Sequence, residues 1–315
     1  MSFSSRKLAL LLTAVTLAVG LFALWTPDLP KDELLQRYGP TSSQVLEVDG
    51  LNIHYQDSGR ADAPVLILLH GFGASLQTWD TWMPQLARDY RVIRLDLPGF
   101  GLTGATPNRD YSEARDVATL KQFADQLGLH HFSVMGHSLG GKLAWALAAD
   151  VPDRVKTLVL MAPDGFAPPD QWGTKPYEVP AIMGLVKYSL PKPLVRQFVG
   201  VGFSDPLSLT DALVDRYHDM LRAPGVRQAI LDRADQTTYA DPTARLQKIK
   251  APTLLIWGEK DRMIPSSNAA SYAQVLQRSQ TVVLPDLGHV IQEAPTEMGL
   301  EQVKAFLSQH LNGAQ

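Results

Sequence analysis

The segment Gly136-His137-Ser138-Leu139-Gly140 fits the pattern Gly-x-Ser-x-Gly. It stands between a β-type run at 132–135 and a helical run at 139–149. A serine hydroxyl becomes a useful nucleophile only when the backbone exposes it and a nearby base takes its proton. A sharp turn from strand to helix exposes the hydroxyl, and flanking glycines leave room for the strained backbone. The pattern makes Ser138 a candidate nucleophile, with an ordinary strand-to-helix turn as the alternative interpretation.

The sequence also offers the base and the acid that a serine nucleophile requires. His289 and Asp261 each follow a strand-like run, at 281–284 and at 253–257. Catalytic groups on a parallel sheet are expected where the carboxyl ends of the strands give way to loops. Both residues meet that condition, and Asp164, which follows an earlier strand-like run, is an alternative acid.

The candidate residues require a framework of parallel strands. Continuous apolar runs are typical of strands buried on both faces, and helical segments alternate with them. Strands are expected at 65–69, 91–95, 132–135, 157–161, 253–257 and 281–284, and core helices at 112–127, 139–149, 266–277 and 296–311. A hairpin is expected at 45–48 and 51–55, because Asp49-Gly50 favours a type I′ turn. The expected fold class is α/β, with a mostly parallel central sheet and helices on both faces.

The alternation of strands and helices stops between 164 and 245. This stretch is rich in Pro, Tyr, Met and Trp, contains no strand-like run, and predicts short helices at 195–201, 209–221 and 226–234. We expect a helical cap at 164–245, inserted into a core formed by 44–163 and 246–315. Apolar side chains of the cap suit an acyl chain or aryl group rather than a charged substrate. The candidate pocket residues are Trp172, Met183, Phe198 and Phe203.

The N-terminus begins with a basic leader and an apolar run. Residues 8–25 carry no charge, and Arg6 and Lys7 precede them. A run of this length just suffices to cross a bilayer as a helix, while Ala18-Val19-Gly20 suits cleavage of an export signal. We expect 1–27 to be a membrane anchor or a cleaved signal, followed by a linker at 28–43. In either case the basic leader stays inside, which places the body outside the cytoplasmic membrane.

Composition excludes several classes of function. The 315 residues carry a net charge of −3 and show no basic stripe, which argues against a nucleic-acid partner. There is no cysteine, so disulfides, thiolate metal sites and a cysteine nucleophile are excluded. The histidines show no metal-ligand spacing. We expect no cofactor and no metal, and a small-molecule ester as the substrate.

Five motifs occur in the order in which α/β-hydrolases carry them, and the chain resembles that family from about Val45 to Leu311. The motifs are His70-Gly71-Phe72-Gly73, Asp96-Leu97-Pro98-Gly99-Phe100-Gly101, Gly136-His137-Ser138-Leu139-Gly140-Gly141, Trp257-Gly258-Glu259-Lys260-Asp261 and Gly288-His289. The resemblance implies a capped α/β-hydrolase of the serine esterase or lipase-like kind. It favours Asp261 over Asp164 as the acid.

The resemblance also implies a role for each matched residue. Ser138 attacks a substrate carbonyl, His289 takes and returns the proton, and Asp261 orients the imidazole. The backbone N–H groups of Phe72 and Leu139 form the oxyanion hole. His70 is expected to support the Phe72 loop through hydrogen bonds, and Asp96 and His137 are interpreted as structural.

A serine nucleophile favours acyl transfer to water. We therefore expect a serine hydrolase that cleaves carboxylic esters with an apolar acyl or aryl group through an acyl-enzyme intermediate. The first alternative is a C–C bond hydrolase of the meta-cleavage product type, which would need a cap cation such as Arg196 or Lys187 to meet the substrate acid. The second alternative is a non-catalytic ligand-binding protein, against which the intact triad argues.

Overall fold

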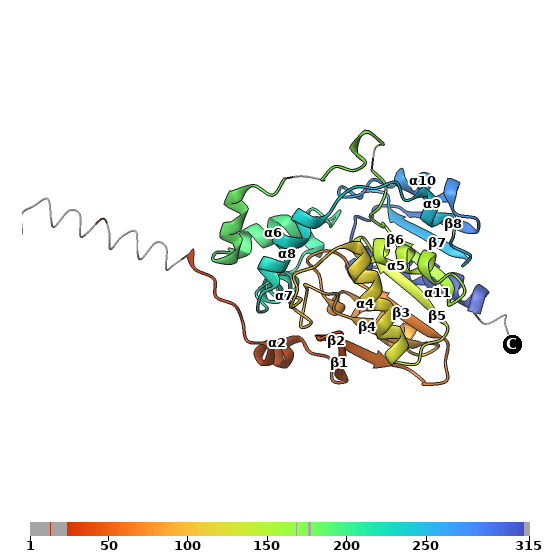
Figure 1. The fold of residues 1–315 in the computed structure, drawn as a ribbon, viewed down its shortest axis with the longest axis horizontal. Coiled ribbons are helices and arrows are strands. Elements are labelled where there is room, and N and C mark those ends of the chain that lie inside the picture. The colour runs from red at the N-terminus through yellow and green to blue at the C-terminus, as the bar shows by residue number, and fades with distance from the viewer. Residues whose placement is uncertain (1–12, 14–23, 168, 176–177, 312–315) are drawn as a thin grey trace, which may run out of the picture.

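The computed structural model describes residues 13, 24–167, 169–175 and 178–311 (Figure 1). The predicted anchor or signal segment at 1–27 lies almost wholly outside these described residues. Within them, no helix combines the length and the apolar character that crossing a membrane would require.

The described part of the chain contains one eight-stranded sheet. Its strands are β1 (Ser43–Val48), β2 (Leu51–Ser58), β3 (Val65–Leu69), β4 (Arg91–Leu95), β5 (Phe132–His137), β6 (Val155–Met161), β7 (Thr253–Gly258) and β8 (Ser279–Leu284). Their order is β1-β2-β4-β3-β5-β6-β7-β8. β2 pairs antiparallel with β1 and β4, and every other neighbouring pair is parallel. The predicted α/β class with a mostly parallel sheet is confirmed.

The hairpin of β1 and β2 forms as its turn residues predict. Val48 pairs with Leu51, so Asp49 and Gly50 alone make the turn. Both have positive φ, 51° and 77°, as a type I′ turn requires. This hairpin adds two antiparallel strands to the edge of the parallel sheet.

Helices cover both faces of the sheet (Figure 1). One face packs against α4 (Glu113–Gln126), α5 (Leu139–Asp150), α9 (Thr243–Leu246) and α10 (Asn268–Val275), and the other against α3 (Met83–Leu86), α11 (Met298–Leu311) and the short turn η1 (Leu76–Trp79). Leu66 and Leu68 face one layer, whereas Ile67 and Leu69 face the other. Successive side chains of a strand point to opposite faces, so burial of both faces explains the unbroken apolar run of β3.

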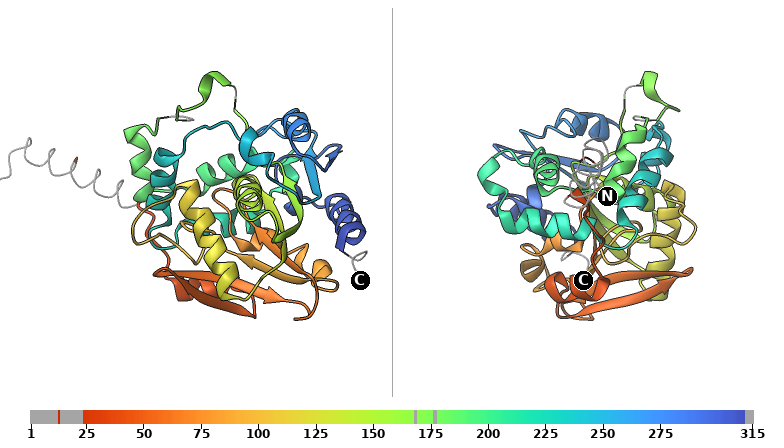
Figure 2. Two further views of the ribbon diagram at one scale, coloured as in Figure 1. Left: turned by 45° about the vertical axis from the view of Figure 1, so that its right-hand side comes forward. Right: turned by 90° about the vertical axis from the view of Figure 1, so that its left-hand side faces the viewer.

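A helical cap lies between β6 and β7 in the chain (Figure 2). It comprises α6 (Lys192–Gly200), α7 (Asp211–Leu221) and α8 (Val226–Gln236), with shorter turns η2 (Pro169–Gln171), η3 (Ala181–Lys187) and η4 (Pro206–Ser208). Val195, Val199 and Val214 belong to its own apolar cluster. α6 begins three residues before the predicted start and includes Pro193 in its first turn. Proline is tolerated there because the N–H groups of the first turn have no helical partner, so the helix loses no hydrogen bond.

The segment predicted as a linker at 28–43 is packed against the cap. It contains α2 (Lys31–Tyr38), whose Leu34 is fully buried among the apolar side chains of the cap. Arg37 and the Tyr38 hydroxyl both donate to Asp219 of α7, over 2.8 and 2.9 Å. The linker therefore belongs to the folded body, because its amphipathic helix has a buried face.

Candidate active site

Ser138 occupies a strained turn between β5 and α5. Its φ of 54° and ψ of −117° lie in a region that non-glycine residues rarely adopt. Three backbone hydrogen bonds hold this conformation: Ser138 donates to Met161 over 2.9 Å, and its carbonyl accepts from Lys142 and Asp164 over 2.9 and 3.1 Å. The turn presents the side chain at the carboxyl end of β5, as the Gly-x-Ser-x-Gly pattern predicts.

The glycines around Ser138 are required by close backbone packing. A Cβ atom on Gly136 would overlap the carbonyl of Gly140, and one on Gly140 would overlap the carbonyl of Leu69. The turn therefore packs directly against the end of β3. Side chains at either position would push α5 away from the sheet.

His289 and Asp261 form a buried hydrogen-bonded pair. Nδ1 of His289 lies 2.7 Å from Oδ2 of Asp261. Oδ1 of Asp261 accepts from the backbone N–H groups of Met263 and Ile264, over 2.8 and 2.9 Å, which fixes the carboxylate. The carboxylate accepts only, so Nδ1 carries the proton and Nε2 of the neutral ring is free to accept one. The alternative acid, Asp164, uses its backbone N–H to bind the Ser138 carbonyl.

His137 connects the nucleophile turn to the His289 loop. Its Nε2 donates to the His289 carbonyl over 3.0 Å, and the two rings lie 4.6 Å apart. Within the described residues, no hydrogen bond joins the Ser138 hydroxyl to His289. Contacts of this kind commonly tighten when substrate binds.

The charge state of His137 suits this position. Burial, together with the neighbouring His289, holds the pKa of His137 well below its usual range. Its Nδ1 has no hydrogen-bond partner among the described residues, as expected of a neutral ring that donates through Nε2. A neutral His137 holds the His289 backbone without placing a second positive charge beside the base. The sequence interpretation of His137 as structural did not specify this hydrogen bond, for which adjacency to Ser138 was the only available clue.

The predicted oxyanion loop lies against the nucleophile turn. A Cβ atom on Gly71 would lie 3.3 Å from the Cβ of Ser138 and 2.9 Å from Nδ1 of His137. The backbone N–H groups of Phe72 and Leu139 donate to no other described residue. As the first residue of α5, Leu139 has no helical partner for its N–H. Both donors are thus available to a ligand.

His70 supports this loop as predicted. Its Nε2 accepts from the backbone N–H of Leu97 over 2.9 Å, so its Nδ1 carries the proton and donates to the Gly71 carbonyl over 2.8 Å. Burial lowers the pKa of His70 and keeps the ring neutral. The side chain ties the loop after β3 to the loop after β4.

The four predicted pocket residues lie in different surroundings. Phe198 lies over the oxyanion loop, with its Cε1 3.7 Å from a Cβ atom built on Gly73. Trp172 lines a cavity of about 740 Å³ with Asp164 and Met263, whereas Phe203 lines a separate cavity of about 350 Å³. Met183 is exposed on η3. Among the four, Phe198 is the residue placed beside the candidate site.

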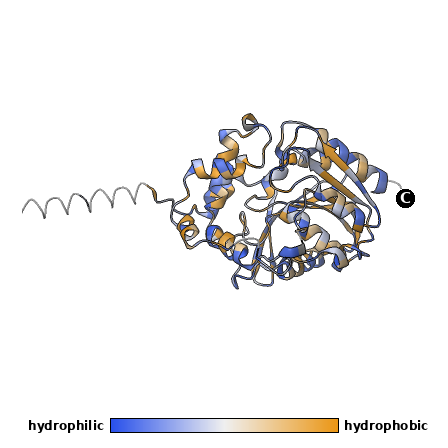
Figure 3. Ribbon diagram, turned by 90° about the horizontal axis from the view of Figure 1, so that it is seen from above, coloured by the Kyte–Doolittle hydropathy of each residue, from blue (hydrophilic) through white to orange (hydrophobic). Residues whose placement is uncertain are grey.

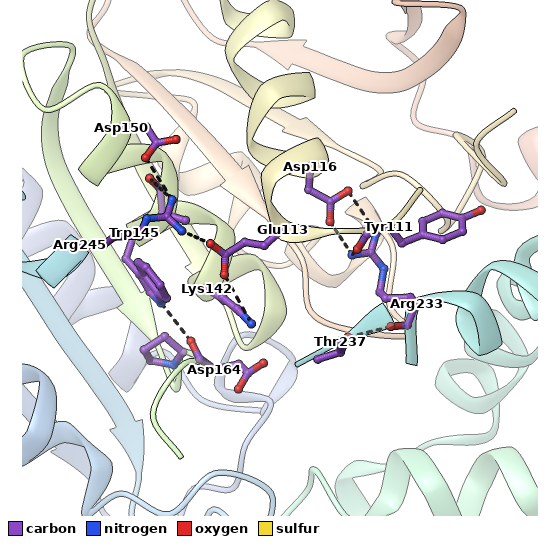
Figure 4. A network of polar contacts seen from close by, with 12 residues as sticks. Tyr111, Glu113, Asp116, Lys142, Trp145, Asp150, Asp164, Arg233, Thr237 and Arg245 are labelled. Atoms are coloured by element: carbon purple, nitrogen blue, oxygen red, sulfur yellow. Dashed lines mark hydrogen bonds and ion pairs between the residues drawn. The ribbon is translucent and has the colours of Figure 1, made fainter. Parts of the chain in front are cut away.

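Two ion-pair clusters hold the surrounding elements together (Figure 4). In one, Arg233 of α8 donates to Asp116 of α4 and to the backbone carbonyl of Pro98 over 2.8 Å. In the other, Glu113 contacts Arg245 and Lys142, which lies in the first turn of α5. The first cluster attaches the cap to the core, and the second attaches α4 to α5, the helix that follows Ser138. No group of side chains suited to a metal ion occurs among the described residues.

Comparison with known proteins agrees with this geometry. A family model for the alpha/beta hydrolase fold matches residues 64–295. The dihydrolipoyllysine-residue acetyltransferase component of an acetoin cleaving system from Pseudomonas putida is 31% identical, over 87% of this chain and 71% of that protein. A 2-hydroxy-6-oxononadienedioate/2-hydroxy-6-oxononatrienedioate hydrolase from Paraburkholderia phymatum is 30% identical, over 88% of this chain and 99% of that protein.

A solved structure is similar over nearly the whole chain. It is a membrane phospholipase A described as a bacterial virulence factor, with a TM-score of 0.74 and 26% identity. The similarity covers 98% of this chain and 100% of the other. The family model, the relatives and the arrangement of sheet, nucleophile turn and cap lead to one conclusion. This chain belongs to the α/β-hydrolase fold family.

Proposed function

We propose that this protein is a serine hydrolase that cleaves carboxylic esters with an apolar acyl or aryl group. One observation carries the proposal: the strained Ser138 lies beside a loop whose His289 is hydrogen-bonded to a buried Asp261. This combination supplies a half-buried hydroxyl on a strained turn, a base with a free ring nitrogen and an acid that fixes the tautomer.

The reaction would proceed in two acyl-transfer steps. The Ser138 oxygen attacks the ester carbonyl while Nε2 of His289 takes its proton. The N–H groups of Phe72 and Leu139 stabilise the negative oxygen of the intermediate, and one such donor contributes on the order of a hundredfold or more in rate. The carbon–oxygen bond to the leaving alcohol then breaks, and the alcohol takes the proton from His289. Water repeats the sequence on the acyl-enzyme and releases the acid.

Two observations support an apolar acyl group. The Phe198 ring lies over the oxyanion loop, next to the place where the acyl carbonyl would sit. The similar solved structure is named a phospholipase A.

A C–C bond hydrolase is the second candidate, and the 30% identical relative named as a 2-hydroxy-6-oxononadienedioate hydrolase favours it. The cap cations that this reaction would need have other partners. Arg196 contacts Asp211 and the Leu209 carbonyl, and Lys187 lies over the Tyr188 ring at 5.8 Å. These contacts make ester hydrolysis the better-supported reaction.

Turnover of p-nitrophenyl butyrate, compared with turnover of a meta-cleavage dienoate, tests the proposal. We expect the ester to be hydrolysed with the higher kcat/KM, and Ser138→Ala to abolish that activity. A higher kcat/KM for the dienoate would favour the C–C bond hydrolase. Absence of both activities, with no covalent labelling of Ser138 by a fluorophosphonate, would favour a non-catalytic protein.

We also propose that residues 1–27 attach the protein to the membrane or direct its export, with the hydrolase domain outside the cytoplasm. The uncharged run at 8–25 behind a basic leader supports this proposal. Recovery of the full chain from the soluble cytoplasmic fraction, with its N-terminus intact, would contradict it.

A further inference from the structure

Exposed apolar side chains are numerous in the cap. Most of the large exposed apolar residues in the described chain lie in the cap or in the segment that enters it, although Leu35, Val45, Met263, Val283 and Met298 lie elsewhere. We call the following set the cap face: Ile182, Met183 and Leu185 of η3, and Leu194, Phe198 and Val201 in and just after α6. Figure 3 shows apolar residues interspersed with polar ones on the helices near the point where the N-terminal chain enters. A concentration of this kind marks a surface that contacts another apolar phase.

The apolar residues of α6 lead from the cap face toward the candidate site. Leu194, Phe198 and Val201 are spaced by four and three residues, so they form one stripe on the helix. Val195 and Val199 lie on another face of the helix and are buried in the cap core. Phe198 in the middle of the stripe reaches the oxyanion loop at Gly73. The stripe thus links solvent-exposed apolar surface to the place where an acyl carbonyl would bind.

The far end of α6 adjoins the His289 loop. The Val290 N–H donates to the Gly202 carbonyl over 3.1 Å, two residues after α6 ends. A Cβ atom on Gly202 would lie 2.8 Å from the Val290 side chain. The helix that carries the stripe is therefore held against the loop that supplies the base.

The described N-terminal segment leaves the body beside the cap face. The Thr26 N–H donates to the Tyr188 carbonyl over 2.8 Å, and the Leu190 N–H donates to the Thr26 hydroxyl over 3.0 Å. Arg227, which is buried, donates to the Thr26 carbonyl over 2.8 Å and to Asp28 over 2.6 Å. These bonds fix the chain at the edge of η3 and the start of α6.

Beyond Thr26 the chain continues into the uncharged run. Leu24 and Trp25 are 57% and 55% exposed and mark the point where residues 8–25 reach the body. A run of this length matches the thickness of a bilayer. Trp25 and the exposed Tyr188 are of the side-chain types that favour the membrane interface. A bilayer crossed by this run would therefore lie beside the cap face.

Two cations beside the cap face are paired with carboxylates. Lys192 is paired with Asp215 over 2.7 Å, and Arg196 contacts Asp211. Paired cations offer little attraction to anionic lipids, so contact with a bilayer would depend mainly on the burial of apolar surface.

We propose that the cap face docks onto a lipid bilayer and that acyl esters held in the bilayer enter the site along the α6 stripe. The docking rests on the exposed apolar surface and on the proposed membrane attachment of residues 1–27, whereas the substrate class rests on the proposed ester hydrolysis. Docking orients the cap toward the membrane, and an acyl chain passes over Phe198 to bring its ester carbonyl to Ser138.

Docking is tested by single-cysteine labelling of the full chain, which has no native cysteine. Leu185→Cys and Leu194→Cys carry a fluorophore on the cap face, and Val283→Cys, exposed on β8, is the matched control. The proteins are reconstituted in phosphatidylcholine vesicles that contain doxyl-labelled lipid. We expect strong quenching at 185 and 194, weak quenching at 283, and no loss of quenching in high salt. Equal, weak quenching at all three positions would overturn the docking.

The substrate route is tested with two esters that share one leaving group. Ile182→Ser/Leu185→Ser is compared with Val283→Ser on water-soluble p-nitrophenyl butyrate and on p-nitrophenyl palmitate dissolved in the vesicles. We expect the double variant to keep its rate on the soluble ester within about twofold and to lose at least about tenfold on the membrane-held ester. Equal rates on the membrane-held ester would refute the route. Quenching at 185 and 194 without hydrolysis of either ester by the unmodified protein would refute the proposed esterase function and leave the docking intact.

Discussion

Nδ1 of His54 lies 2.8 Å from Oδ2 of Asp96, the same contact that joins His289 to Asp261. Nε2 of His54 lies 3.0 Å from the hydroxyl of Ser43, so Ser43, His54 and Asp96 are in hydrogen-bond contact, whereas the Ser138 hydroxyl makes no such bond to His289. The surroundings of the two serines differ. Ser43 begins β1 and pairs with Gln56 in the sheet, whereas Ser138 occupies a strained turn beside free backbone donors. The same three side chains therefore need not do the same chemistry.

Ser43→Ala and Ser138→Ala form a matched pair of variants. We expect Ser138→Ala to lower kcat/KM for an apolar ester by about 10⁴-fold or more, because it removes the attacking atom. We expect Ser43→Ala to remain within a few fold of the unmodified protein, because its serine has no strained turn and no oxyanion loop. Hydrolysis of p-nitrophenyl butyrate and mass spectrometry of fluorophosphonate-labelled peptides measure both. Loss of activity in Ser43→Ala, with normal labelling of Ser138, would contradict the assignment of the reaction to Ser138.

His137 is a positioning residue that acts through the backbone of His289. We expect His137→Ala to lower kcat by about ten- to a hundredfold with little change in KM, because the base loses its support. His137→Gln can place an amide N–H near the former Nε2 and should recover much of the rate. A structural role alone would not distinguish the two variants in kcat. Steady-state kinetics on one soluble ester, with circular dichroism to check folding, provides the comparison.

The lowered pKa values of His70 and His137 predict a stability that decreases in acid. Burial is the main cause of both shifts. In the unfolded chain these rings titrate near about pH 6.5. Below that pH the unfolded chain binds more protons than the folded chain, until the lowered folded pKa is reached. Above about pH 6.5 the two rings do not lower the free energy of unfolding. Below that pH each ring lowers it by up to about 1.4 kcal/mol per pH unit, until the lowered folded pKa is reached.

Urea unfolding at pH 7.5, 6.5 and 5.5 measures this dependence. We expect the free energy of unfolding of His137→Gln to change less between pH 6.5 and 5.5 than that of the unmodified protein. Buried carboxyls with raised pKa, such as Asp116 and Glu293, act in the opposite direction but are present in both proteins. Their effect therefore cancels in the difference. If the unfolding free energy of the two proteins changed equally with pH, burial would not lower the pKa of His137 in the folded chain.

The pair of Arg233 and Asp116 should matter to stability far more than an exposed pair. Both side chains are buried, so Arg233→Met leaves an uncompensated carboxylate and should cost about 3–5 kcal/mol of unfolding free energy. The matched control is Lys250→Ala, which breaks an exposed pair with Asp153 and should produce no measurable change. Urea denaturation at neutral pH measures both. A similar midpoint for Arg233→Met and the unmodified protein would show that the cap is not held to the core by this pair.

The strands and the order of the chemical groups could be predicted from local patterns. The apolar run of β3 is unbroken because the strand is buried on both faces, and Asp49-Gly50 specifies a turn through its own backbone preferences. Such features depend on neighbouring residues. The position of Ser138 belongs to the same class, since a strand, a turn and a helix follow one another directly.

Other features depend on contacts between distant parts of the chain. The docking of α2 through Leu34 requires a cap surface nearly 200 residues away, which no local pattern reveals. The role of His137 depends on where the carbonyl of His289 points. The predicted pocket residues were chosen for their apolar character alone, and only the packing of the cap places Phe198 near the loop and Met183 in solvent.

The bonds that Arg227 makes to Thr26 and Asp28 bear on how this enzyme should be trimmed for laboratory work. A shorter version that starts after Tyr38 would remove Leu34 from the apolar cluster of the cap and leave the buried Arg227 guanidinium without these partners. A version that starts near Leu24 would remove most of the apolar, uncharged run and keep all of these hydrogen bonds. The version that starts near Leu24 should remain folded and monodisperse in solution, whereas the version that starts after Tyr38 should aggregate.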